Sequence, residues 1–237
     1  MYKTFHFESL DSTNTYLKDN YETYDDMSFV SANIQTNGKG RSGRKWNSDN
    51  SNLLFSLLIK DELLITKYKQ ISILTAYSIL QVLRELGIND LSIKWPNDIY
   101  VKDSKICGIL LEGISKDKFE CLIVGVGLNV NQVLFEDEYL ICPTSIKNEL
   151  YKDINIEMIK QRVYDTLSYN LDKLKQGYEF YNDIKKFDYL VNKEVYALIN
   201  NQKQKVTVLG INEDYSLKIK FDNSIRDIET GEISFHI

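Results

Sequence analysis

The chain has 237 residues, 43% of them apolar, and a formal net charge of −5, an ordinary globular composition that excludes a largely disordered or fibrous protein. It contains no long uninterrupted apolar run and no apolar signal core, so we expect neither a membrane span nor export, and a cytoplasmic location. With only His6 and His236, and three cysteines (Cys107, Cys121, Cys142) without metal-type spacing, the composition disfavours a histidine-based hydrolytic triad or metal site.

In chain order, the first half mixes strand and helix patterns. FHFESL reads as a short alternating strand, and Ser12 is a good N-cap for a helix over 13–24. Strands are predicted over 27–36 and 52–60, and helical periodicity covers 62–86. Four closely spaced strands follow, over 91–95, 99–101, 105–113 and 119–131. Their short connections predict a mixed or antiparallel sheet and not a doubly wound one.

The second half changes character after two predicted helices, at about 155–176 and 178–188. Five short strand patterns then follow: VYALIN, KVTVLGI, SLKIKF, RDIE and ISFHI. So many strands in so few residues are typical of a small SH3-type barrel. We therefore predict an α+β domain over 1–188 and a compact β domain over 189–237.

The loop NGKGRSGRKW (37–46) raises the first functional question. Its glycines have the spacing of a dinucleotide-binding turn, but the residues after Gly43 are too polar and turn-forming for the helix that such a turn requires. The loop carries four cations in an otherwise acidic chain. The loop could therefore close over a small, highly charged anion such as a polyphosphate, and Arg41 and Arg44 could donate paired hydrogen bonds to the phosphate oxygens. An exposed hairpin with solvated charges is the alternative.

Several strands also contain residues that a simple sheet does not need. Lys94 lies in an apolar strand before a turn at Pro96, and Lys105 opens another apolar strand. Glycines at 108, 125 and 127 mark either bulges or the close approach of a ligand. Asn129 and Asn131 are predicted to end the last strand on the same side, as turn residues or as donors to a base edge.

In this order, QTNGKGRSGRKW, KWPNDIYV, KICGILLEG and VGVGLNVN resemble the successive signature motifs of biotin protein ligases, and the STN at 12–14 and the closing ETGEIS fit as well. The resemblance covers nearly the whole chain, with Lys39 where the family pattern has arginine. Many bacterial relatives carry an N-terminal winged-helix domain that binds DNA. The STN lies close to Met1, so the resemblance implies a ligase that is not itself a repressor.

The resemblance implies a class II synthetase-like ligase domain over 1–188 and an SH3-like domain over 189–237. It implies that biotin is activated by ATP as biotinyl-5′-AMP and passed to a lysine of the biotin carboxyl carrier protein of a carboxylase. ATP and biotin are then substrates, and Mg²⁺ is expected with the ATP. The alternatives are a lipoate ligase of the same superfamily, and a non-catalytic regulatory or nucleic-acid-binding module. The carrier's identity and the choice between monomer and homodimer stay open.

By the same resemblance, the site residues fall into three groups. Arg41 and Arg44 would engage the phosphates, Lys105 would bridge the biotin carboxylate and the α-phosphate, and Asp98 would either orient the carrier lysine or help to hold Mg²⁺. The biotin site would comprise Ser12, Thr13, Asn14, Gln35, Gly38, Lys39, Arg41, Lys105, Gly108 and Gly125. The ATP or adenylate site would comprise Arg41, Arg44, Trp46, Lys94, Asn97, Lys105, Asn129 and Asn131.

Overall fold

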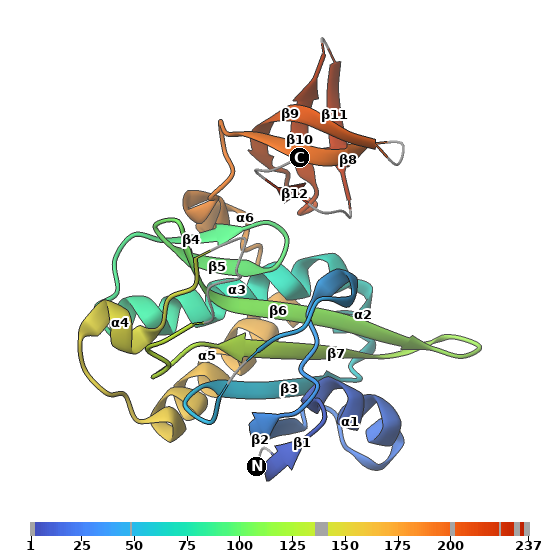
Figure 1. Ribbon diagram of the computed structural model, residues 1–237. Helices are drawn as coiled ribbons and strands as arrows, with labels where there is room; N and C mark the ends of the chain where they lie inside the picture. The colour runs from blue at the N-terminus through green and yellow to red at the C-terminus, as the bar shows by residue number, and fades with distance from the viewer. Residues whose placement is uncertain are drawn as a thin grey trace.

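The computed structural model describes residues 3–47, 49–135, 142–199, 202–222, 224–229 and 233–234. Two sheets organise them, a large mixed sheet from the first half of the chain and a small sheet from its C-terminal part (Figure 1). The α+β class expected from the sequence is therefore confirmed. None of the helices within these ranges combines the length and the apolarity that crossing a bilayer requires.

The large sheet has seven strands in the order β1-β2-β3-β7-β6-β5-β4. β1 and β2 are parallel, and every other neighbouring pair is antiparallel, so the predicted mixed sheet is confirmed. The strands are β1 (Thr4–Leu10), β2 (Phe29–Gln35), β3 (Leu53–Ile59), β4 (Leu91–Lys94), β5 (Asp98–Val101), β6 (Ser104–Ser115) and β7 (Phe119–Leu128).

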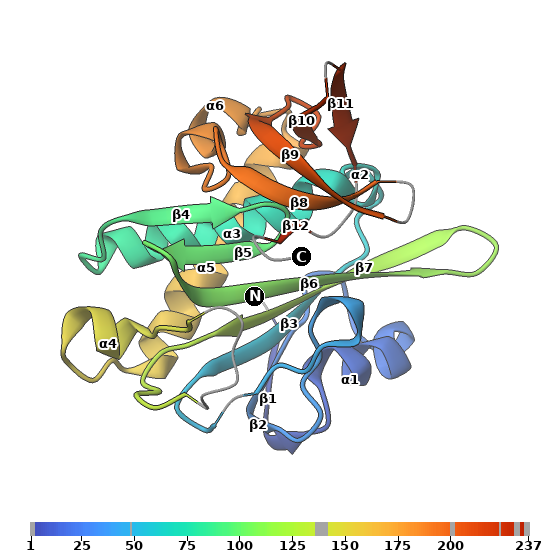
Figure 2. The ribbon, with the colours of Figure 1, turned by 45° about the horizontal axis from the view of Figure 1, so that its top comes forward.

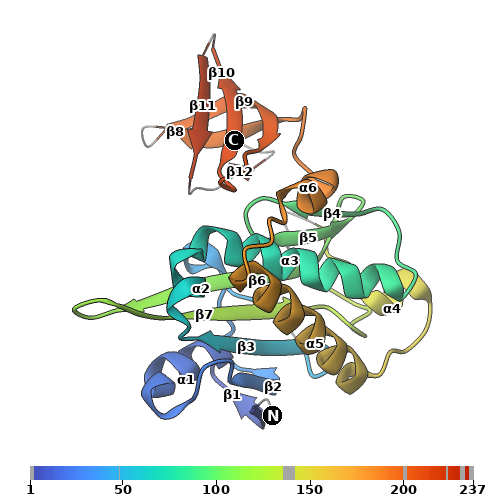
Figure 3. The same cartoon turned by 180° about the vertical axis from the view of Figure 1, so that it is seen from behind.

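Helices cover both faces of this sheet. α2 (Glu62–Thr66), α3 (Tyr68–Glu85) and α5 (Ile156–Lys175) lie on one face, where α3 and α5 run side by side (Figure 3). α1 (Thr13–Asn20) packs on the other face, against β2, β3 and β7. Leu57 packs toward the larger core and its neighbour Leu58 toward the core under α1. The central strands are therefore apolar at almost every position, because both of their faces are buried.

Three helix predictions differ from the structure. The helix expected over 13–24 ends at Asn20 and continues only as the turn η1 (Tyr21–Thr23), and the one over 62–86 is broken at Lys67, whose backbone is not helical. The helix expected over 178–188 is reduced to α6 (Tyr181–Ile184) and the turn η3 (Lys185–Phe187). A short helix that periodicity did not predict, α4 (Ile146–Leu150), is capped by the Ser145 hydroxyl.

The small sheet is antiparallel, with the strand order β11-β10-β9-β8-β12. Its strands are β8 (Glu194–Ile199), β9 (Gln202–Ile211), β10 (Leu217–Phe221), β11 (Ser224–Ile228) and β12 (Ile233–Ser234), as the five strand patterns predicted. Pairing between β11 and β12, which would close a barrel, is not found among the described residues. Residues 230–232 of the ETGEIS motif and residues 235–237 of the last predicted strand, including His236, lie outside those residues.

Specific contacts join the two sheets. The Trp95 indole donates a hydrogen bond of 2.9 Å to the Tyr215 carbonyl, and Lys69 forms a 2.9 Å ion pair with Glu229. Buried apolar residues of both sheets belong to one continuous cluster. The chain passes from one sheet to the other between Asp188 and Glu194, near the predicted division at 188/189, which stays a prediction because a shared core does not separate two domains.

Candidate functional site

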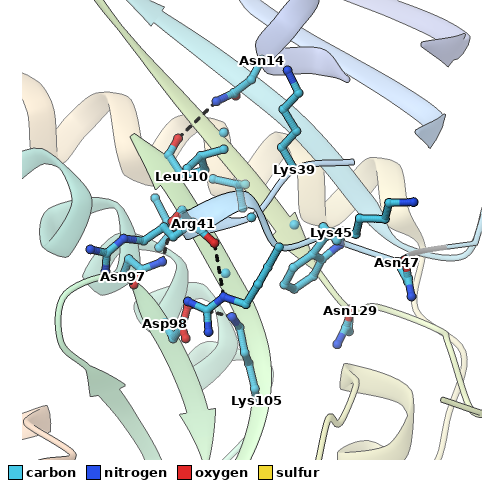
Figure 4. Close-up of a pocket in the computed structure, with 18 of the residues that line it drawn as sticks. Asn14, Lys39, Arg41, Lys45, Asn47, Asn97, Asp98, Lys105, Leu110 and Asn129 are labelled. Carbon is cyan, nitrogen blue, oxygen red and sulfur yellow. Dashed lines mark hydrogen bonds and ion pairs between the residues drawn. The ribbon is translucent and has the colours of Figure 1, made fainter. Parts of the chain in front are cut away.

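A cavity of about 400 Å³ opens beside the N-terminus of α1, over the glycine-bearing parts of β6 and β7 (Figure 4). Its wall also includes the loop 39–47, the turn 94–98 and Ile233 of β12. Figure 2 shows the β12 end of the small sheet turned toward β5 and β6. Segments from nearly the whole length of the chain thus meet at one opening.

Most of the residues predicted from the sequence line this cavity: Ser12, Thr13, Asn14, Gln35, Lys39, Arg41, Arg44, Trp46, Lys94, Asn97, Asp98, Lys105, Gly108, Gly125 and Asn129. Two predicted residues do not line it, Gly38 and Asn131. β7 ends at Leu128, before Asn131, whose side chain instead exchanges hydrogen bonds of 2.8 and 2.9 Å with the backbone of Ile154. Gly38 closes the neck of the loop, where its carbonyl accepts from the Trp46 amide.

The loop 37–46 folds as a tight hairpin. Lys39 and Lys45 form an antiparallel bridge, and the Gly40 amide donates to the Arg44 carbonyl at 2.7 Å. The tip is the single turn η2 (Arg41–Gly43), with positive φ at Ser42 and Gly43. The next helix begins only at Glu62, so the helix that gives a dinucleotide fingerprint its anion site is missing, as the sequence indicated.

Cations dominate the cavity wall. Six lysines and arginines line it, and Asp98 is the single acid among its described residues. Lys105 Nζ lies 2.8 Å from Asp98 Oδ1, and Arg41 donates to Asn97 Oδ1 at 3.1 Å, which ties the hairpin to the turn after β4 (Figure 4). The excess of positive charge suits a ligand with several negative charges.

Lys94 is the most deeply buried of these cations, with 6% of its surface exposed. Its Nζ lies 5.5 Å from the centre of the Tyr100 ring. Burial lowers the pKa of Lys94, an effect that the nearby Asp98 carboxylate opposes and the Lys105 ammonium adds to. A buried ammonium in an otherwise apolar strand is costly, which is typical of a functional position.

The floor of the cavity holds the indole of Trp46. A Cβ at Gly127 would lie 2.3 Å from the ring and one at Gly108 would lie 2.8 Å from it, so only glycine lets the ring rest on these strands. Lys105 Nζ lies 5.3 Å from the ring centre. The buried Trp46 Nε1 has no hydrogen-bond partner in the described part of the chain. Gly127, which the predicted site omitted, is thus part of the floor.

The end of the cavity near α1 is polar and ordered by hydrogen bonds. Gln35 Oε1 accepts hydrogen bonds from the Thr13 amide at 2.8 Å and from the Thr13 hydroxyl at 3.0 Å, while Ser12 caps the helix. Behind this layer lie Ser56 and Glu112, which the predicted site also omitted. Their sequence signal is a polar residue inside the apolar runs NLLFSLLIK and KICGILLEG.

The side chains offer little for a metal ion. Among the described residues, no group of three or more histidine, cysteine, aspartate or glutamate side chains is placed to hold one. Of the described residues that line the cavity, Asp98 alone supplies a carboxylate, and it already faces Lys105. A Mg²⁺ ion would therefore need most of its oxygen ligands from a bound phosphate and from water.

Comparison with known proteins gives consistent matches. Residues 6–129 match the biotin/lipoate A/B protein ligase family. The biotin protein ligase of Aquifex aeolicus, solved in complex with biotin and ATP, is 30% identical, with a TM-score of 0.86 over 99% of this chain and 98% of that one. The bifunctional ligase/repressor BirA of Salmonella typhimurium is 29% identical over 95% of this chain and 72% of its own length. The biotin–[acetyl-CoA-carboxylase] ligase of Paracoccus denitrificans is 32% identical over 43% of this chain and 44% of its own.

Proposed function

The chain belongs to the biotin/lipoate A/B protein ligase family, and on that basis we propose that it is a biotin protein ligase. It activates biotin with ATP as biotinyl-5′-AMP and transfers the biotinyl group to a lysine of the carrier protein of a biotin-dependent carboxylase. A cytoplasmic location suits an enzyme that uses ATP.

One observation supports this function above the others. The cavity has a strongly cationic end, around Arg41, Lys94 and Lys105, and an end with uncharged hydrogen-bonding groups, around Thr13 and Gln35. A triphosphate needs the first kind of surface and the polar, uncharged ureido ring of biotin needs the second. The two ends share one cavity, so the carboxylate of biotin can meet the α-phosphate between them.

The first step joins two anions that repel one another. A carboxylate oxygen of biotin attacks the α-phosphorus, the bond to the β-phosphate breaks, and pyrophosphate leaves with the electron pair. Lys105 and Arg41 would neutralise the carboxylate and the α-phosphate, and Arg44 the departing phosphates, so that charge developing in the transition state meets fixed cations. Trp46 would offer its ring face to the adenine.

Magnesium is expected to enter with ATP. The described side chains fit an ion carried by phosphate and water oxygens, since they form no protein cage for it. Bound there, Mg²⁺ would neutralise part of the triphosphate charge. We therefore assign Asp98 to the second step, where its carboxylate would orient the carrier lysine.

In that second step the lysine amine attacks the acyl carbon, the bond to the phosphate oxygen breaks, and AMP leaves. The mixed anhydride must be kept from water and from other amines until the carrier arrives. The hairpin 37–46, which Arg41 holds to Asn97, would cover it.

Pyrophosphate release from ATP tests this function directly. We expect release with the purified chain to depend on biotin and to be negligible with lipoate in its place. Release without biotin, or a preference for lipoate, would contradict the proposal.

A further inference from the structure

Four side chains form a column beside the cationic end of the cavity. Lys94 Nζ lies 5.5 Å from the centre of the Tyr100 ring, and the rings of Tyr100 and Tyr189 stack with their centres 4.8 Å apart. Lys193 Nζ lies 3.3 Å from the centre of the Tyr189 ring. Rings this close leave no room for an ammonium between them, so both lysines lie outside the pair. Lys94, at one end of the column, lines the cavity.

Tyr189 belongs to the connection that leads from the large sheet into the small one (Figure 1). Its amide donates a hydrogen bond of 3.0 Å to the Ile93 carbonyl, and Ile93 and Asp188 form a parallel bridge, so the connection runs along the outer edge of β4. Its hydroxyl donates to Asp103 Oδ1 at 2.8 Å. The Tyr189 ring is therefore fixed to the large sheet by both its backbone and its hydroxyl.

The preceding residue attaches the same connection to the small sheet. The Asp188 carboxylate accepts a hydrogen bond of 3.1 Å from the Ile211 amide of β9 and one of 2.9 Å from the Leu190 amide. Tyr189 thus lies where the two sheets are joined, and its ring supports Tyr100 from the side of this joint.

Tyr100 contributes its ring, and not its hydroxyl, to the column. The side chain is 2% exposed, and its hydroxyl has no hydrogen-bond partner within the described part of the chain. A buried hydroxyl without a partner is unfavourable, so a phenylalanine would make the same ring contacts without that cost. Substitution can therefore separate the effect of the ring from that of the hydroxyl.

Lys94 has a buried charge that such a ring can stabilise. Burial lowers the pKa of Lys94, and the Asp98 carboxylate opposes this effect. Three neighbouring cations repel the ammonium and lower the pKa further: Lys105, Arg44 and Lys193. The face of an aromatic ring attracts an ammonium, more strongly where water is excluded. The Tyr100 ring therefore offsets part of the burial and the repulsion, and it favours the position of Nζ beside the cavity.

We propose that Tyr100 and Tyr189 are positioning residues that hold the Lys94 ammonium at the cavity wall, where it binds the phosphates of ATP. The proposal rests on the function proposed above, in which the cationic end receives the triphosphate. Neither tyrosine lines the cavity, so each acts through its neighbour in the column. The joint between the two sheets would in this way take part in ATP binding.

Substitutions that remove a ring, or only a hydroxyl, test this role. The measurements are KM for ATP in biotin-dependent pyrophosphate release, Kd for biotin by calorimetry, and urea unfolding. Tyr100→Leu should raise KM for ATP about tenfold and leave Kd for biotin unchanged, because only a phosphate-binding cation loses its support. Tyr189→Leu should raise KM for ATP about threefold, since it removes the ring behind Tyr100. Tyr100→Phe keeps the ring and should keep the wild-type KM for ATP.

A double-mutant cycle with Lys94→Met shows whether the rings act through Lys94. Lys94→Met should itself raise KM for ATP, and Tyr100→Leu added to it should raise KM no further, because the group that the ring supports is already gone. Tyr164→Leu is the control for the loss of a buried ring. Tyr164 is 3% exposed and packs from α5 against Phe29 of β2. This control should lower the free energy of unfolding and leave KM for ATP unchanged.

The outcomes separate the two proposals. If the wild-type enzyme uses biotin but folded Tyr100→Leu and Tyr189→Leu keep its KM for ATP, the positioning role is wrong while the ligase function stands. An undiminished effect of Tyr100→Leu in the Lys94→Met background would also overturn the role, because the ring would then act by another route. If the wild-type enzyme does not respond to biotin, the ligase function itself fails, and this role fails with it. Should Tyr100→Leu not fold, Tyr189→Leu decides alone, because Tyr189 is only half-buried.

Discussion

Replacing Gly125 with alanine perturbs the polar end of the cavity at one atom. A Cβ at this position would lie 2.1 Å from Asn14 Oδ1 and 2.7 Å from Asn14 Cγ, whereas ordinary contacts begin at 3.4 Å. The amide must therefore move by more than 1 Å to make room. It cannot do so freely, because Ser56 and Glu112 hold its two ends.

The expected cost follows from these contacts. Moving the Asn14 amide breaks two hydrogen bonds, each worth about 1 kcal/mol. Residual overpacking adds about 1 kcal/mol, and the loss of glycine's freedom in the unfolded chain returns up to about 1 kcal/mol. We expect Gly125→Ala to lower the free energy of unfolding by about 2 kcal/mol. We also expect it to raise KM for biotin about tenfold, since the neighbouring Thr13 would lose its place.

Urea unfolding and the biotin dependence of pyrophosphate release measure both effects. Gly113→Ala is the matched control, because a Cβ there would also approach a side chain closely, at 2.4 Å from Phe119. The Phe119 ring is 42% exposed and can turn outward, so the control should change neither quantity by much. If Gly125→Ala matches the control in both stability and KM for biotin, the Asn14 amide is not held as described.

Three further predictions concern the cationic end. Arg41→Gly removes the hydrogen bond between the hairpin and Asn97. The variant enzyme should still form the adenylate but release it, so that lysines of proteins other than the carrier become labelled. If this labelling does not exceed that of the wild-type enzyme at equal adenylate output, the proposed role of Arg41 is wrong. Lys94→Met should raise the free energy of unfolding near neutral pH, because burial disfavours the charged ammonium that the methionine replaces. Burial lowers the pKa of Lys94 below 10.5, the value expected in the unfolded chain. Between the lowered pKa and pH 10.5 the unfolded chain binds more protons, so the stability of the wild-type protein should rise relative to that of the variant. If urea unfolding gives the same difference in free energy between the two proteins at pH 7 and at pH 10.5, this prediction is wrong. Removing Mg²⁺ with EDTA should abolish the release of pyrophosphate from ATP, whereas biotin binding measured by calorimetry should persist. If pyrophosphate is still released, the site does not depend on a metal ion.

Much of the fold could be read from the sequence because it depends on local patterns. Ser12 was predicted as an N-cap and is one, since capping needs only a hydroxyl beside the first helical turn. Helix ends were less predictable. Periodicity continues through Lys67, yet the chain bends there, and α6 stops after one turn as the chain enters the small sheet. Such breaks depend on what the segment packs against.

The site shows the same division. The cations of the hairpin were identifiable because their charge and glycine spacing are unusual within a few residues. Ser56 was not singled out, and Gly127 was marked only as a bulge or the close approach of a ligand, because their places depend on which strands pair and in what register. Asn131 was expected to share a strand face with Asn129, but β7 ends at Leu128; its assignment to the adenylate site stays a prediction.

The sequence by itself determined most of the strands, the long helices, the cationic glycine hairpin and the order of the motifs, since each is encoded by neighbouring residues. Only the tertiary structure decided that Ser56, Gly125 and Leu110 form one row across three strands, with Asn14 seated on it. That row depends on the register between segments distant in the chain, which hydrogen bonding and packing select together. The register therefore decides which residues lie behind Thr13 and Asn14 at the polar end of the cavity.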